Sequence, residues 1–151
     1  MKRSIIGFLL FLVMVIGLMA DTTVKIDKVD TPENVLLSFE SAINNKDYLR
    51  AWNYWGTAPS NDYTKWEKGY KGTKSIELFY KFRDSDAGAG NRWVTYNVKV
   101  FAVNTDGKKH LYEGYYTLRS TSPDLYDSID KWPGWKIEKG QPLSGGHPFV
   151  F

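Results

Sequence analysis

The spacing of the apolar residues changes once along this chain, near Gly72, and this change limits the possible folds more than any other feature. Before Gly72, apolar side chains recur every three or four residues, which indicates amphipathic helices. After Gly72 they alternate with polar side chains, which indicates strands with one buried face. Helices followed by consecutive antiparallel strands are typical of an α+β domain whose helices cover one face of the sheet. The 151 residues suffice for one such domain.

Three helical segments are expected before the change of period. The first has Thr31 as its N-cap and Pro32 in its first turn. Its predicted apolar face consists of Val35, Leu36, Phe39, Ala42 and Ile43. A second segment covers residues 48–56, and a third, shorter one is capped by Ser60 or Asp62.

Four strands are expected after the change of period, at residues 74–83, 92–104, 109–120 and 135–139. Asp106-Gly107 predicts a tight hairpin between the second and third strands. Residues 84–90, with the sequence DSDAGAG, are expected to form a glycine-rich turn. The predicted inward positions are Ile76, Leu78, Tyr80 and Phe82, then Val94, Tyr96, Val98, Val100 and Ala102, then Tyr112, Gly114, Tyr116 and Leu118.

Three stretches of this chain resemble the NTF2-like superfamily, in particular its small exported bacterial members of unknown function. They are residues 31–52, which open with Thr-Pro-Glu, residues 63–70, and residues 114–119 together with 135–137. The resemblance implies a cone-shaped α+β fold over residues 31–139. It implies little about activity, because this fold supports enzymes, ligand binders and assembly modules. Catalytic members, which include ketosteroid isomerase, dehydratases and polyketide cyclases, place an Asp or His inside the cone, and no expected inward position here carries one.

The first residues predict an export signal. Lys2 and Arg3 precede an apolar run over residues 5–19, and Ala20 suits a cleavage site, so residues 1–20 read as a signal peptide and residues 21–30 as a polar lead-in. The protein is then periplasmic or secreted, unless the segment is retained as a membrane anchor. Without residues 1–20, 18 of the 20 Lys and Arg remain against 17 Asp and Glu, a balance that does not favour nucleic-acid binding. Residues 140–151 are expected to form a C-terminal tail.

Aromatic residues are unusually frequent, at 16% of the chain. The candidate ligand-binding residues are Trp52, Trp55, Trp66, Tyr80, Tyr96, Tyr112 and Tyr116. They could line a concave pocket for a small apolar ligand or simply fill the core. The absence of Cys and the presence of only two His argue against a zinc site, and no nucleophile-elbow or phosphate-loop motif occurs, so neither a cofactor nor a catalytic residue is expected.

These observations favour a non-catalytic exported binding or interaction module, with a small apolar ligand or a protein partner on its aromatic concave side. One alternative is an enzyme of the isomerase, dehydratase or cyclase type that uses Tyr hydroxyls with Glu77 or Glu113, although both are expected to point out of the sheet. Another is a membrane-tethered component of a secretion assembly. The resemblance also implies a homodimer through the open face of the sheet, where Thr95, Asn97, Lys99 and Phe101 would lie.

Overall fold

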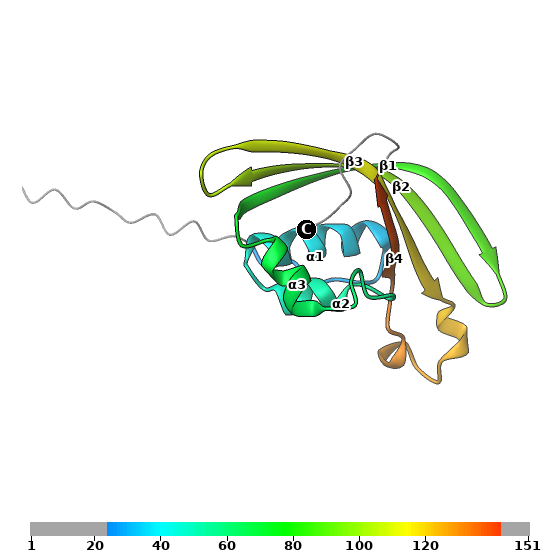
Figure 1. Ribbon diagram of the computed structural model, residues 1–151. Coiled ribbons are helices and arrows are strands. Elements are labelled where there is room, and N and C mark those ends of the chain that lie inside the picture. The colour runs from blue at the N-terminus through cyan, green and yellow to red at the C-terminus, as the bar shows by residue number, and fades with distance from the viewer. Residues whose placement is uncertain (1–23, 143–151) are drawn as a thin grey trace, which may run out of the picture.

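The computed structural model describes residues 24–142, so the expected signal segment and residues 143–151 of the expected tail lie outside the described part. Within it, three helices pack on the concave side of a curved four-stranded antiparallel sheet, which confirms the α+β prediction and agrees with an NTF2-like cone (Figure 1). The helices are α1 (Pro32–Asn44), α2 (Tyr48–Asn53) and α3 (Tyr63–Gly69). The strands, in spatial order, are β1 (Thr73–Gly88), β2 (Asn91–Asn104), β3 (Lys109–Thr121) and β4 (Lys136–Pro142).

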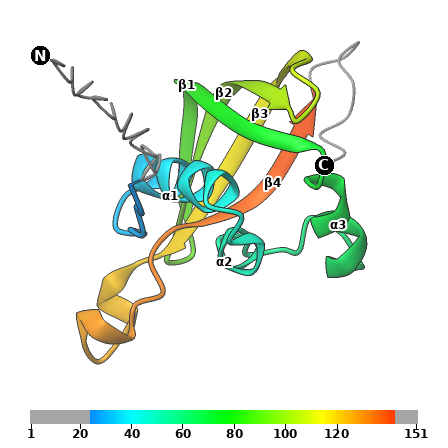
Figure 2. The same ribbon diagram turned by 90° about the vertical axis from the view of Figure 1, so that its left-hand side faces the viewer.

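Helix α1 forms as its local sequence predicts and supplies the helical half of the core. Thr31 is the N-cap and its hydroxyl accepts a hydrogen bond from the backbone N–H of Asn34, while Pro32 occupies the first turn. The whole predicted apolar face is buried: Val35, Leu36, Phe39, Ala42 and Ile43. Figure 2 shows that α1 crosses the concave face of the sheet. Asp62 caps α3, which settles the choice left open by the sequence.

Polar side chains of α1 cover the free edge of β1. The Asn44 amide donates to the carbonyl of Ile76 at 2.9 Å and accepts from its N–H at 2.8 Å. One helical turn before Asn44, a carboxylate oxygen of Glu40 accepts a hydrogen bond from the N–H of Leu78 at 3.2 Å. Because β1 is the first strand of the sheet, these bonds satisfy backbone groups that would otherwise be open to pairing with another chain.

Glu40 gives a prediction about pH. Burial raises the pKa of its carboxyl, the hydrogen bond from Leu78 opposes this effect, and the charge of Glu77 adds to the rise. The folded state therefore holds this proton more tightly than the unfolded state, and the carboxyl destabilises the fold increasingly as the pH rises through that raised pKa. We expect Glu40→Gln to be more stable than the wild type at pH 7 and to lose this advantage near pH 4. Urea denaturation at the two pH values tests this, and a pH-independent difference would contradict it.

The inward and outward positions of the sheet follow the predicted alternation over its central part. Val98, Val100 and Ala102 of β2 are buried, as are Tyr116 and Leu118 of β3. Asn104 to Lys108 form the predicted turn, in which Gly107 has a φ of +84°. Tyr80 and Phe82 were expected inside but are 37% and 57% exposed, because the β1–β2 hairpin projects past the helices (Figure 1).

Three boundaries differ from those expected. The second helical segment, expected over residues 48–56, ends at Asn53, because Trp55 pairs with Ile137 of β4 instead. The DSDAGAG segment is mostly strand: β1 continues to Gly88 after a register shift between Phe82 and Asp84. The turn contains only Ala89 and Gly90, with φ of +49° and +76°, the positive values that a type I′ hairpin turn requires at both positions. Residues that usually form turns therefore belong to the strands of a long hairpin here, because they pair with β2. At the other end of the chain, β4 extends through residues 140–142, so the strand is longer than expected.

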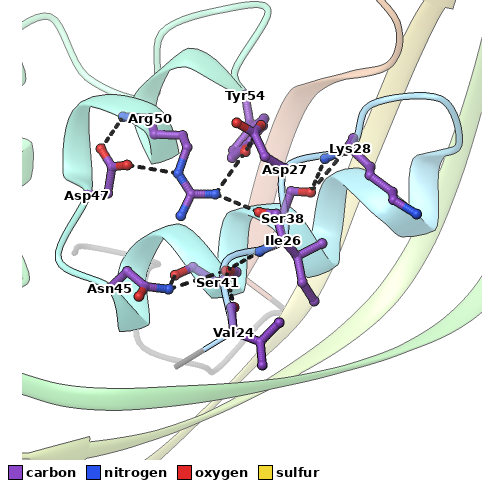
Figure 3. A network of polar contacts seen from close by, with 10 residues as sticks. All are labelled: Val24, Ile26, Asp27, Lys28, Ser38, Ser41, Asn45, Asp47, Arg50 and Tyr54. Atoms are coloured by element: carbon purple, nitrogen blue, oxygen red, sulfur yellow. Dashed lines mark hydrogen bonds and ion pairs between the residues drawn. The ribbon is translucent and has the colours of Figure 1, made fainter. Parts of the chain in front are cut away.

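Residues 24–30, here called the N-terminal strap, pack along α1 although their sequence has no regular period (Figure 3). Two buried serines of α1 hold them. The Ser38 hydroxyl accepts from the N–H of Lys28 and donates to its carbonyl, and the Ser41 hydroxyl accepts from the N–H of Ile26. These bonds satisfy an extended backbone that has no sheet partner, so the strap belongs to the folded domain.

No helix among residues 24–142 has the length and apolar character needed to cross a membrane.

Candidate functional site

A pocket of about 220 Å³ lies beside β4, where the loop after α2 and helix α3 approach the edge of the sheet. We call it the β4 pocket. Its apolar walls are provided by Trp55, Pro59, Trp66 and Tyr116, and its polar atoms come from Thr57, Glu138 and Lys139. It is therefore lined by rings and also offers hydrogen-bonding groups, which is the composition of small-molecule sites.

Backbone pairing with β4 fixes the position of Trp55. The chain after α2 runs parallel to β4 and forms a bridge between Trp55 and Ile137. The N–H of Gly56 donates to the carbonyl of Ile137, and the N–H of Ile137 donates to the carbonyl of Tyr54, both at 2.8 Å. As a result the Trp55 ring lies edge-on to the Tyr116 ring, with 5.8 Å between centroids and 87° between planes.

Gly140 has no side chain, and this absence leaves room for the rings of Trp55 and Tyr116. It pairs with Tyr116 across the sheet. A Cβ atom at Gly140 would lie 2.7 Å from Cε1 of Tyr116 and 3.2 Å from Cη2 of Trp55. Both distances are shorter than ordinary carbon contacts, so any side chain here would displace the aromatic wall.

A β-bulge aims Glu138 at the pocket. Thr117 pairs with Lys139 and Leu118 pairs with Ile137, so Glu138 is the extra residue of β4. Its Oε1 accepts a hydrogen bond from the Thr57 hydroxyl at 2.9 Å. Its Oε2 is buried and has only an ionic contact, at 3.4 Å, with Nε of Arg119. Oε2 thus lacks a hydrogen bond within residues 24–142, and it has almost no surface that a ligand in the pocket could touch.

Among the residues of the pocket, the indole N–H of Trp55 is the second buried polar group that lacks a hydrogen bond. Its nitrogen is inaccessible to solvent and finds no acceptor within residues 24–142. Buried polar groups are nearly always satisfied in folded proteins, so such a donor requires an explanation. The Tyr116 hydroxyl is protonated at neutral pH, because burial raises its pKa further.

The seven candidate residues do not form one site. Trp55, Trp66 and Tyr116 line the β4 pocket, and Trp52 packs against Trp66 with 5.2 Å between centroids. The other three lie elsewhere on the sheet: Tyr80 and Tyr96 form a pair at 5.5 Å, and Tyr112 stacks on His110 at 6.2 Å. The rings therefore divide into a pocket group and separate packing groups.

The carboxylates considered for an enzyme lie on the outer face of the sheet, as expected. Glu77 is exposed, and Glu113 forms an ion pair with Lys99 at 2.8 Å. A different carboxylate meets a tyrosine on the inner side: the Tyr96 hydroxyl donates a hydrogen bond to Glu33, in the first turn of α1. Burial, followed by the bond to Glu33, raises the pKa of Tyr96. Sequence analysis did not identify this pair, because no local pattern links residues 63 positions apart.

Six further pocket residues escaped sequence analysis, and Thr57, Glu138 and Gly140 are the ones that shape the site. A strictly alternating strand over residues 135–139 does not reveal a bulge at Glu138, and Gly140 was assigned to the tail. Among residues 24–142 no group of three or more His, Cys, Asp or Glu is placed to hold a metal ion.

Comparison with known proteins supports the fold alone. No family model matches this chain, and no curated protein matches it. Among solved structures, it is similar to a "putative aromatic ring hydroxylase" from Novosphingobium aromaticivorans, at 11% sequence identity and a TM-score of 0.52. The similarity covers 72% of this chain and 82% of that one. At this identity the arrangement of helices and strands is shared, and no residue role can be transferred.

Proposed function

We propose that this domain is a binding module that holds a small, largely apolar ligand in the β4 pocket. The observation that carries the proposal is the lining of the pocket, in which the rings of Trp55, Trp66 and Tyr116 form the walls and Thr57, Glu138 and Lys139 add polar groups. A ligand that covers these rings gains about 25 cal/mol for each Å² of apolar surface removed from water.

Ligand-induced stabilisation tests this proposal. Benzene, toluene, phenol and indole, each at millimolar concentration, are expected to raise the melting temperature if they bind only the folded state. We expect Ala58→Phe to weaken binding at least tenfold, because Ala58 lines the pocket and a ring there would fill it. The matched control is Ala87→Phe, on the exposed part of β1. Equal affinity of a compound for the two variants would contradict the proposal, and so would the absence of stabilisation by all four compounds.

The second candidate function is an enzyme of the isomerase, dehydratase or cyclase type. One observation favours it, the Glu33–Tyr96 pair on the inner side of the sheet. The similar solved structure is also named as an enzyme, although as a hydroxylase. A carboxylate beside a protonated hydroxyl is a combination used in acid–base catalysis. Turnover of a carbonyl substrate that survives in both Glu33→Gln and Tyr96→Phe would eliminate this pair as its source.

The remaining expectations stay predictions. Export, to the periplasm or outside the cell, depends on residues 1–20, and so does the membrane-tethered alternative.

For a homodimer through the open face, Phe101 offers apolar surface: it is 43% exposed and lies edge-on to Phe79 with 5.6 Å between centroids. Lys99 lies on the same face, ion-paired with Glu113, whereas Thr95 is largely buried. Membership of the NTF2-like superfamily also stays a prediction, beyond the shared fold.

A further inference from the structure

We propose that residues 147–151 return along the outer edge of β4 as a fifth strand and place the Phe151 ring at the mouth of the β4 pocket. A ligand then has to displace a side chain of the protein itself. The strand is independent of the proposed function, whereas the displacement of Phe151 by a ligand rests on it. The inference follows from the edge of β4, the sequence of residues 143–151, the direction of Gly140 and the size of the pocket.

The edge of β4 that faces away from β3 offers backbone groups to a further strand. β4 is the last strand of the sheet, and in the described part of the chain this edge is paired only at Ile137, which bonds to the chain after α2. Ile137 lies opposite Leu118 of β3. Hydrogen-bonded and non-hydrogen-bonded pairs alternate along an antiparallel ladder, so the pairs two and four residues from Leu118 are of the same kind. These pairs contain Gly140 and Pro142, whose backbone groups therefore also point away from β3.

The sequence of residues 143–151, LSGGHPFVF, contains a turn that leads the chain back along this edge. Gly145-Gly146 is a typical two-residue hairpin turn, because glycine accepts the positive φ that such turns require. The segment carries no Asp, Glu, Lys or Arg, so its packing beside rings buries none of these charges. It begins three residues after Gly140, which lines the pocket, so no long linker separates the two.

This turn selects the same backbone groups that β4 leaves unpaired. Counted from the turn, Phe149 pairs with Pro142 and Phe151 pairs with Gly140. The pair that closes a two-residue hairpin is hydrogen-bonded, and so is every second pair after it, which includes these two. Pro148 falls in an intervening pair, where no N–H is needed. The sheet and the turn therefore give the same register independently.

Gly140 decides which side of the fifth strand faces the pocket. A Cβ atom on Gly140 would point at the rings of Tyr116 and Trp55. Paired residues on neighbouring strands project from the same face of a sheet, so in this register Phe151 projects toward these rings and Val150 away from them. An aromatic side chain opposite a glycine of an edge strand also stabilises the pair, because it covers the bare glycine.

The size of the β4 pocket suits one phenyl ring. An engineered protein cavity of about 150 Å³ accepts benzene, and this pocket has a volume of about 220 Å³. Its walls are the rings of Trp55, Trp66 and Tyr116, on which a further ring can pack edge-on or offset. The Phe151 ring and a small aromatic ligand therefore compete for one space.

Hydrogen exchange at single amides, followed by NMR in the full chain, tests the strand without any ligand. In the proposed register the N–H of Phe149 bonds to β4, whereas the N–H of Val150 points to solvent. After correction for intrinsic rates, we expect Phe149 to exchange at least fivefold more slowly than Val150. Equal protection of the two amides would overturn the strand. Protection that rises with protein concentration would also overturn it, because a second copy would then supply the partner.

Toluene titrations of full-chain variants test the position of the Phe151 ring. We expect Phe151→Ser to bind toluene at least threefold more tightly than the wild type, because the competing ring is gone. Val150→Ser is the matched control: it shortens the neighbouring side chain on the other face and should change the affinity less than twofold. Equal affinities of the wild type and Phe151→Ser would overturn the position of the ring. Failure of toluene to bind all three proteins would overturn the proposed function, and the exchange result would still decide the strand.

Discussion

Phe39→Ala is expected to lower the free energy of unfolding by about 3–5 kcal/mol, the usual cost of deleting a buried ring. Phe39 of α1 is 1% exposed. Its ring lies edge-on to Trp55 and to Tyr116, with centroid distances of 6.2 Å and 6.4 Å, so it supports both of these walls of the β4 pocket. Removing it loses apolar burial and leaves a cavity behind them, which the surrounding residues can fill only in part.

Urea denaturation followed by tryptophan fluorescence measures this loss. The matched control is Phe79→Ala, because Phe79 is 49% exposed on the outer face. We expect that variant to lose roughly 1 kcal/mol or less, as surface substitutions do. Toluene should restore part of the stability of Phe39→Ala, since the new cavity would adjoin the pocket. Similar losses in the two variants would show that Phe39 does not have the central packing role described here.

Arg50→Met is expected to cost about 1–3 kcal/mol, because it leaves partly buried acceptors without their charged donor. The Arg50 side chain is 10% exposed. It donates to Asp47 at 2.9 Å, to the carbonyl of Ile26 at 2.6 Å and to the Tyr54 hydroxyl at 3.2 Å (Figure 3). Tyr54 in turn donates to Asp27 of the N-terminal strap at 2.6 Å. Methionine preserves the packing of the long side chain and removes these bonds.

The effect should concentrate in the N-terminal strap, which hydrogen exchange can resolve. The N–H groups of Ile26 and Lys28 donate to Ser41 and Ser38, so their protection reports whether the strap is docked. We expect both amides to exchange faster in Arg50→Met. The control is Lys131→Met, which removes an exposed ion pair with Asp127 and should change stability by about 0.5 kcal/mol or less. Undiminished protection of the strap in Arg50→Met would contradict the role assigned to Arg50.

Several features of the fold could be predicted because they depend on neighbours in the sequence. The cap of α1 requires only Thr31 and the next few residues, and the turn at Asp106-Gly107 requires only its own backbone conformation. The same holds for the buried faces of α1 and of the centre of β2, which follow from periods of 3.6 and 2.

Other features depended on partners far along the chain. The turn-like DSDAGAG segment became strand because β2 offers it a continuous ladder. The serines on the buried side of α1 look unfavourable in isolation, but Ser38 and Ser41 satisfy the backbone of the N-terminal strap. The aromatic excess was evident from the sequence, whereas its division into a pocket group and packing groups was not.

The sequence by itself determined the α+β class, the order of the elements and the apolar faces of α1 and of the centre of the sheet, because these result from periodicity and hydrogen bonds over a few residues. Only the tertiary structure decided which polar groups meet the rings. Thr57 and Glu138 are 81 positions apart, and they meet because Trp55 bridges to Ile137 and a bulge turns Glu138 toward the loop. Register shifts and edge pairings of this kind depend on the whole sheet, so no local pattern specifies them.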